Sequence, residues 1–144
     1  MRTSRVVTGM AIAAALGCGS PLGLVRNVHF AFQLSADPAP GGSLRYEFEV
    51  RNRSERTVYL PACGGYVVPE FRVIRPDGSR TGISLLCLAV FSSEPVALGP
   101  GDAYRGSGGL ARVSGTQYTP LMPIGFDLAD GRYQRVRAPS FTVP

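Results

Sequence analysis

The sequence predicts an all-β fold, a β-sandwich of about seven to nine short strands in a single domain. Three observations favour this fold. From residue 27 onward, apolar and polar residues alternate with a period of two in segment after segment. Glycine and proline number 18 and 12, and they cluster between these segments, as turn residues do. The same region lacks a persuasive helical stripe, and many short strands at regular spacing indicate a sandwich.

The overall composition argues against several classes of protein. With 144 residues, 44% of them hydrophobic and 17% charged, the chain has the ordinary composition of one globular domain and not that of a disordered protein. The formal net charge is +5, and every basic residue is an arginine. These arginines are scattered singly, without a basic run or an aromatic stripe, so no nucleic-acid partner is expected.

The N-terminal residues have the pattern of a secretory signal peptide. Residues 1–5 form a short positive region, and residues 6–16 form an apolar segment of 11 residues, which is too short to span a bilayer. We therefore expect a signal peptide at residues 1–17, a lipid-attachment cysteine and tether at residues 18–26, and a β-sandwich domain at residues 27–144. Arg2 and Arg5 leave with the signal peptide, so 13 arginines then oppose 10 acidic residues, a net charge of +3.

Cys18 follows the apolar segment directly, and Ala15-Leu16-Gly17-Cys18 resembles the lipobox of bacterial lipoproteins. The resemblance implies that Cys18 receives lipid, with palmitate among its acyl chains, and anchors the domain to a membrane on the periplasmic side. Gly19 resembles the residue found in lipoproteins sent to the outer rather than the inner membrane. Ala15 stands where the family usually has leucine, and a signal peptidase cutting nearby would instead release a secreted protein.

The cysteine count supports lipidation. An exported chain with three cysteines has one left over, and acylation of Cys18 leaves Cys63 and Cys87 as a disulfide pair in an oxidising compartment. Their bridge would close a loop of about 25 residues and contribute about 3.5 kcal/mol in the chain-entropy model. A zinc site is the alternative, but the short paired spacings of zinc ligands are missing and only His29 could assist. No metal and no cofactor are therefore expected.

The predicted strands follow the alternating segments in order. Residues 28–34 form the first, residues 44–50 form the clearest, and residues 57–60 return after a turn at 52–56. The remaining predicted strands are 66–75, 83–91, 96–98, 103–113, 124–128, 132–137 and 141–143. Residues 83–91 are almost continuously apolar, so this strand is expected to cross the core with Cys87 inside it.

The turns between these strands have recognisable chemistry. Pro76-Asp77-Gly78 closes one strand, and in Gly99-Pro100-Gly101-Asp102 the proline fixes φ while the glycine supplies a positive φ. Asn52-Arg53-Ser54 matches a glycosylation acceptor, but after a bacterial-type leader it is interpreted as a turn.

No residue is predicted to be catalytic. Glu47 and Glu49 would share a face of their strand at about 7 Å, a spacing that an inverting glycosidase could use. Arg45 and Arg51 flank them on that face and favour both ionised forms, so neither carboxyl is expected to act as a general acid. A solvated charge ladder is the preferred interpretation. His29, the only histidine, falls on a polar strand face, and no serine stands in a nucleophile elbow.

One glycine-rich motif resembles a phosphate-binding loop only superficially. Gly106-Ser107-Gly108-Gly109 lacks the lysine and the following helix that such a loop needs, so a flexible or bulged strand is predicted.

The turns together resemble a known family, the bacterial intracellular proteinase inhibitor domain. The hairpin over residues 46–58, the Pro-Asp-Gly turn at 76–78, the segment 98–102 and Asp-Gly-Arg-Tyr at 130–133 carry the resemblance, which covers residues 44–137. It implies an immunoglobulin-like sandwich and proteinase inhibition. The chain departs from the family in its export signal, in Cys63 and Cys87, and in having no tryptophan.

These observations favour a cell-envelope lipoprotein, not an enzyme, whose sandwich binds a protein partner in the envelope. The best candidate for a binding loop is residues 61–69, with Tyr66 as the contact residue, because Cys63 would stiffen it. The alternative, from the family resemblance, is a proteinase inhibitor that uses the same loop.

Overall fold

The computed structural model describes residues 26–35, 42–84, 86–129 and 131–144. The predicted signal peptide, the lipid-attachment residue Cys18 and all of the tether except Arg26 lie outside these residues.

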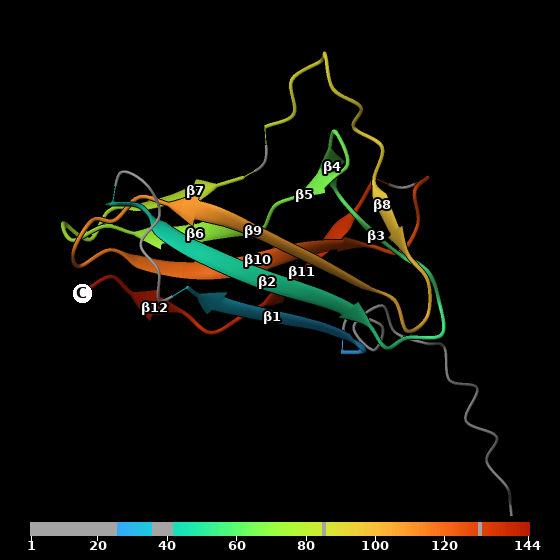
Figure 1. Cartoon of the computed structure of the whole chain (residues 1–144), viewed down its shortest axis with the longest axis horizontal. Coiled ribbons are helices and arrows are strands. Elements are labelled where there is room, and N and C mark those ends of the chain that lie inside the picture. Colours follow the sequence, from blue (N-terminus) through green and yellow to red (C-terminus); the bar gives the residue numbers. More distant parts are fainter. Residues whose placement is uncertain (1–25, 36–41, 85, 130) are drawn as a thin grey trace, which may run out of the picture.

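The described chain is a β-sandwich, which confirms the predicted fold class, although it has twelve strands rather than the predicted seven to nine (Figure 1). A three-stranded sheet lies over a larger seven-stranded sheet, a two-stranded hairpin projects from one edge, and every strand pair is antiparallel. The strands are β1 (Val28–Leu34), β2 (Leu44–Asn52), β3 (Val58–Leu60), β4 (Ala62–Cys63), β5 (Tyr66–Val67), β6 (Glu70–Ile74), β7 (Arg80–Ile83), β8 (Val96–Leu98), β9 (Ala103–Leu110), β10 (Gln117–Gly125), β11 (Tyr133–Arg137) and β12 (Phe141–Thr142).

The three-stranded sheet has the order β1-β2-β9 and fulfils the predicted alternation. In β2, Tyr46, Phe48 and Val50 are buried, while the charged residues between them lie on the outer face. Successive side chains of a strand point to opposite sides of the sheet, so every second residue lies on the same face. The period-two pattern of the sequence therefore identified the buried face of this sheet correctly.

The larger sheet has the order β7-β6-β10-β3-β8, with β11 and β12 paired to the other edge of β10. Its inner face meets the three-stranded sheet through aromatic rings. Phe71 lies 5.4 Å from Tyr46 between ring centres, and Phe141 stacks on Phe32 at 5.7 Å. Aromatic pairs at such distances add to the gain from apolar burial. The core thus fills the space between the sheets with rings from β1, β2, β6 and β12.

The central strand was not predicted. The sequence placed a strand at residues 124–128, but β10 covers residues 117–125 and contains Pro120 and Pro123. A proline cannot donate to a strand ladder, which argues against a central strand. Here the carbonyl of Pro120 faces the gap between β11 and β12, where it accepts from Ala138. Pro123 faces the opposite way, toward the gap between β6 and β3. Each missing N–H therefore points at a break in the neighbouring strands.

The prediction for residues 83–91 was wrong. These residues do not cross the core: β7 ends at Ile83, and the chain then forms an exposed loop that returns at β8. The sequence alone could not decide between the two structures, because an apolar run is compatible with a core strand and with a surface loop.

The predicted turn chemistry is confirmed at both proline turns. Asp102 N donates to Gly99 O at 3.1 Å around Pro100 and Gly101, and Gly101 has φ of 85°. Pro76 begins a turn in which Gly78 N donates to Arg75 O at 2.9 Å, joining β6 to β7. A positive φ is readily adopted only by glycine at these places.

Candidate binding site

The most unusual surface of the described chain is the loop at residues 84–95, between β7 and β8. Four of its large apolar side chains are largely exposed: Leu86 (83%), Leu88 (57%), Val90 (83%) and Phe91 (53%). Residues 81–93 contain no charged side chain. The loop extends well past the sheets (Figure 1). Contact between clustered apolar side chains and water is unfavourable, so such a cluster marks an interaction site or an aggregation liability.

A disulfide holds this loop to the β4–β5 hairpin. Cys63 and Cys87, the pair expected from the cysteine count, are bonded, with Cα atoms 5.3 Å apart. Gly64 N donates to Ser92 O at 2.8 Å, and the Phe91 ring lies against Gly64. The loop is therefore fixed at two points on its length, and less conformational freedom is lost when it binds.

The hairpin itself is closed by two glycines. Gly64 and Gly65 have φ of 59° and 82°, the two positive values that a type I′ turn requires. This turn matches the twist of antiparallel strands, so β4 and β5 can pair over only two residues each. The predicted binding loop at residues 61–69 is thus a tight hairpin rather than an irregular loop.

Tyr66, the predicted contact residue, is 74% exposed and lies opposite Cys63 in the hairpin. The next residue, Val67, is buried, and its N–H donates to the Tyr104 hydroxyl at 3.1 Å. This bond ties the hairpin to β9. Tyr66 therefore stands on a supported backbone, in the same disulfide-linked unit as the exposed apolar loop. We call residues 61–69, 84 and 86–95 together the stapled loop.

The carboxylate pair lies on the outer face of the three-stranded sheet. Glu49 Oε2 accepts a hydrogen bond from Arg105 Nε at 2.6 Å, and its Oε1 accepts one from Arg51 Nε at 3.1 Å. The Arg105 hydrogen bond is the main cause that lowers the pKa of Glu49 below its usual value. Glu47 accepts a longer bond from Gln33 at 3.4 Å. Both oxygens of Glu49 are paired with arginine and its pKa is lowered, which favours the ionised form expected from the sequence.

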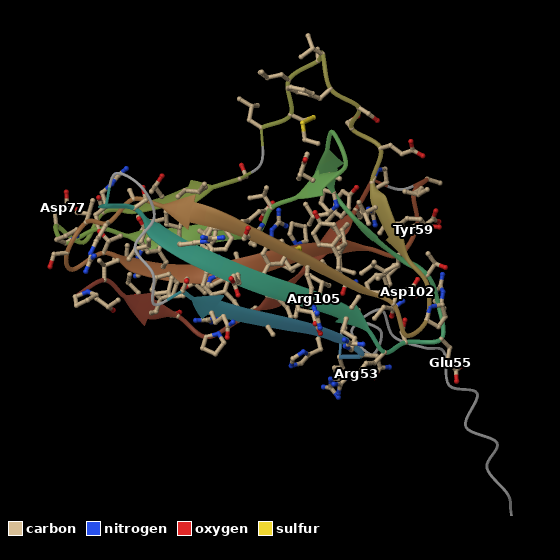
Figure 2. The ribbon with its side chains drawn as sticks, viewed as in Figure 1. Arg53, Glu55, Tyr59, Asp77, Asp102 and Arg105 are labelled. Carbon is tan, nitrogen blue, oxygen red and sulfur yellow. A yellow bond between two sulfur atoms is a disulfide. The ribbon has the colours of Figure 1, made fainter. Side chains whose placement is uncertain are left out.

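An open hollow of about 630 Å³ lies over this face, lined by side chains of all three strands, among them Glu47, Glu49, Arg105 and Ser107. Figure 2 shows Arg105 on this side of the molecule. His29 is exposed on the same face, opposite Arg51 in the strand register. None of the described residues form a group of three or more side chains that could hold a metal ion. A search of the described residues for an apolar helix long enough to cross a membrane finds none.

The other two motifs have structural explanations. Asn52 is fully buried, and its Nδ2 donates to the carbonyl oxygens of Arg56, Leu98 and Gly99, while its Oδ1 accepts from Ser54. Such a side chain holds two turns together and is not available as a glycosylation acceptor, as the turn interpretation predicted.

The glycine-rich motif is part of β9 and is regularly paired with β2. A Cβ atom at Gly106 would lie 2.6 Å from the Phe48 ring, and one at Gly108 would collide with Tyr46. The rings of β2 occupy the space that side chains would take. The motif is therefore a regular strand with a packing role, and the predicted bulge is not observed there.

The sequence missed the four apolar residues of the loop as candidate contacts. A signal was present, because Cys63 immediately precedes Gly64-Gly65, a dipeptide that closes tight hairpins on protein surfaces. Because Cys87 is bonded to Cys63 beside this turn, the segment around Cys87 is more easily placed at the surface than across the core.

The comparisons with known proteins support the fold. No protein-family model matches the chain, and no curated protein matches it. The Northeast Structural Genomics Consortium target SoR45 is similar, with a TM-score of 0.56 and 11% identity over 82% of this chain and 86% of that chain. A Bordetella pertussis structure described as the ApaA protein has a TM-score of 0.47 and 11% identity over 81% and 89% of the two chains. At this identity, the likeness to the first structure shows a common all-β fold alone.

Proposed function

We propose that this chain is a cell-envelope lipoprotein whose sandwich is a protein-binding module, without enzymatic activity, and that the stapled loop is its binding surface. The observation that carries the proposal is the exposure of Leu86, Leu88, Val90 and Phe91 on a loop held by a disulfide. Apolar and aromatic anchors that leave water on binding supply most of the free energy of protein interfaces. A supported loop presents them at a reduced entropic cost.

The position of the loop favours a protein partner over the lipid surface. In Figure 1 the loop extends on one side of the sandwich, and β1 begins at the opposite, lower side. In this proposal the tether joins a lipid on Cys18 to that lower side and the domain stands on the outer membrane, facing the periplasm. The loop then points away from the membrane, toward other envelope proteins.

The same loop supports a second candidate function, proteinase inhibition. An inhibitor needs a projecting, rigid segment that enters an active-site cleft, and the disulfide between Cys63 and Cys87 supplies the rigidity. Inhibition at submicromolar concentration, lost in Tyr66→Ala or on reduction, would favour this function. We expect no stoichiometric inhibition of serine proteases or metalloproteases, because the family resemblance rests on scaffold turns.

The test compares two pairs of exposed apolar residues. Leu88→Ser with Val90→Ser changes the loop, and Leu128→Ser with Val113→Ser changes side chains of comparable exposure elsewhere. Surface changes of this kind leave stability within about 0.5 kcal/mol. The full-length chain, affinity-purified from native envelopes, should retain a stoichiometric protein partner in the control pair and lose it in the loop pair. Equal recovery in both pairs would refute the role of the loop.

A further inference from the structure

The free edge of β9 is open for strand pairing. Asn52 N donates to Asp102 O, so the even-numbered residues of β2 direct their backbone groups toward β9. In β9, the backbone N–H and C=O groups of their partners, Tyr104, Gly106 and Gly108, point toward β2. The N–H and C=O groups of the residues between them therefore point away from β2, and among the described strands β9 pairs with β2 alone. Four successive pairs of backbone groups face this edge, from Ala103, Arg105, Ser107 and Gly109.

This edge lacks the usual protection against pairing. Natural sheets block their edges with lysine, with proline or with a bulge. β9 has none of these over its eight residues. Its single charged residue, Arg105, is held by Glu49. An unpaired edge of this length and composition is suited to accept another strand.

The inner side of the edge is apolar. Because Gly106 and Gly108 have no side chains, the rings of Phe48 and Tyr46 lie directly beneath the strand. Tyr104 stacks on Phe48 at 6.0 Å between ring centres. A strand added beside β9 would place every second side chain next to these rings, and the others would face solvent with Arg105 and Ser107.

The stapled loop adjoins this edge. The Tyr104 hydroxyl on β9 accepts a hydrogen bond from Val67 on β5, and Cys63 on β4 bonds to Cys87 of the loop. In Figure 1 the hairpin and the loop extend past β9 on the side of its free edge. Two copies of this chain that met through β9 would each bring this projection against the other, so an extended segment is a better fit than a second sandwich.

We infer that the β9 edge accepts an extended segment of the partner protein as an added antiparallel strand, with apolar residues alternating with polar ones. This inference rests on the proposed function and names the kind of partner. Backbone hydrogen bonds to the four open residues of β9 would provide affinity, and the alternate apolar side chains would lie beside Tyr104, which is partly exposed and stacks on the buried Phe48. The stapled loop would hold the part of the partner that lies beyond the strand.

The test uses Ser107, whose N–H points away from β2. Ser107→Pro removes one open donor without removing a bond to β2, since edge strands tolerate proline at such positions. Ser107→Ala is the matched control, because it keeps the N–H and loses only the hydroxyl. The probe is a phage-displayed library of random octapeptides, selected on the full-length chain in detergent. Enriched peptides should alternate apolar and polar residues.

The enriched peptide should bind Ser107→Pro at least tenfold more weakly and Ser107→Ala within twofold of the original chain. In the unchanged protein, it should slow amide hydrogen exchange at Arg105, Ser107 and Gly109, a readout that does not depend on how the proline variant folds. A library without binders, peptides without alternation, or unchanged exchange at these amides would overturn the inference.

The two proposals fail separately. If Leu88→Ser with Val90→Ser abolishes partner recovery while Ser107→Pro leaves it intact, the stapled loop binds the partner and strand addition is wrong. If neither variant changes recovery of the partner, neither the stapled loop nor the β9 edge is the binding surface; if the unchanged protein retains no stoichiometric partner, the proposed protein-binding function itself is wrong.

Discussion

Gly108 and Gly109 are neighbours in β9, but replacement of each by alanine should have opposite effects on stability. A Cβ at Gly108 would overlap the Tyr46 hydroxyl and lie 2.5 Å from Cζ of that ring. A Cβ at Gly109 would lie no closer than 3.7 Å to any atom, at Leu44 O, which is an ordinary contact. Neither glycine has a positive φ, so backbone strain does not distinguish them.

Tyr46 cannot easily move aside. It is 3% exposed, stacks on Phe32 at 5.2 Å and contacts Phe71 at 5.4 Å between ring centres. Overpacking of such a site costs about 1–3 kcal/mol. Alanine also reduces the freedom of the unfolded chain, which stabilises by about 0.4–1 kcal/mol where the native backbone permits it. Gly108→Ala should therefore destabilise by about 1–2 kcal/mol, and Gly109→Ala should stabilise by less than about 1 kcal/mol.

Thermal unfolding followed by circular dichroism measures this difference. For a domain of this size about 1 kcal/mol corresponds to about 4 °C, so the two variants should differ in Tm by about 6–12 °C. Tyr46→Leu, which shortens the obstructing side chain, should remove most of the extra cost of Gly108→Ala in a double-mutant cycle. Equal Tm values for the two alanine variants, or additive effects in the cycle, would show that the aromatic rings do not require these glycines.

Three further predictions concern the turns, the disulfide and the charge ladder. Asn52→Asp should destabilise by about 3 kcal/mol in denaturant unfolding, because three carbonyl oxygens, of which that of Leu98 is buried, lose their donor; an unchanged midpoint would contradict this. Replacing both Cys63 and Cys87 by serine should destabilise by less than about 3.5 kcal/mol, because the exposed loop is freed in the folded state too, and proteolysis should then cut residues 84–95 first; a loop that stays resistant would contradict this. The pKa of Glu49 is lowered on folding, so its contribution is present above pH 4.5 and lost as the pH falls through the folded pKa. The Tm advantage over Glu49→Gln should therefore disappear in acid, and an advantage that persists there would contradict the ion pair.

The sequence predicted the features that local patterning controls. The alternation in β1 and β2 located the buried face of one sheet, because each strand has one buried side and one solvent-exposed side. Pro100 and Gly101 identified their turn because few residues adopt those backbone angles. The cysteine count led to the bonded pair of Cys63 and Cys87.

What the sequence could not predict depends on contacts distant along the chain. Pro120 and Pro123 fit a central strand only because two pairs of neighbouring strands leave gaps opposite them. Glycine is required at positions 106 and 108 because two aromatic rings on β2, about 60 residues earlier, occupy the space of a side chain. Periodicity also cannot distinguish an apolar loop from a buried strand, so the exposure of Leu86, Leu88, Val90 and Phe91 needed the structure.

Photo-crosslinking in native cells tests most directly whether the stapled loop binds a partner. A photoreactive residue replaces Val90, which is 83% exposed on the loop, in the full-length chain. The control position is Glu55, which is also exposed and lies at the lower end of the sandwich, away from the loop (Figure 2). Illumination should link one discrete envelope protein to position 90 and none to position 55. No product at position 90, or the same product at both positions, would contradict the assignment of the loop as the binding surface.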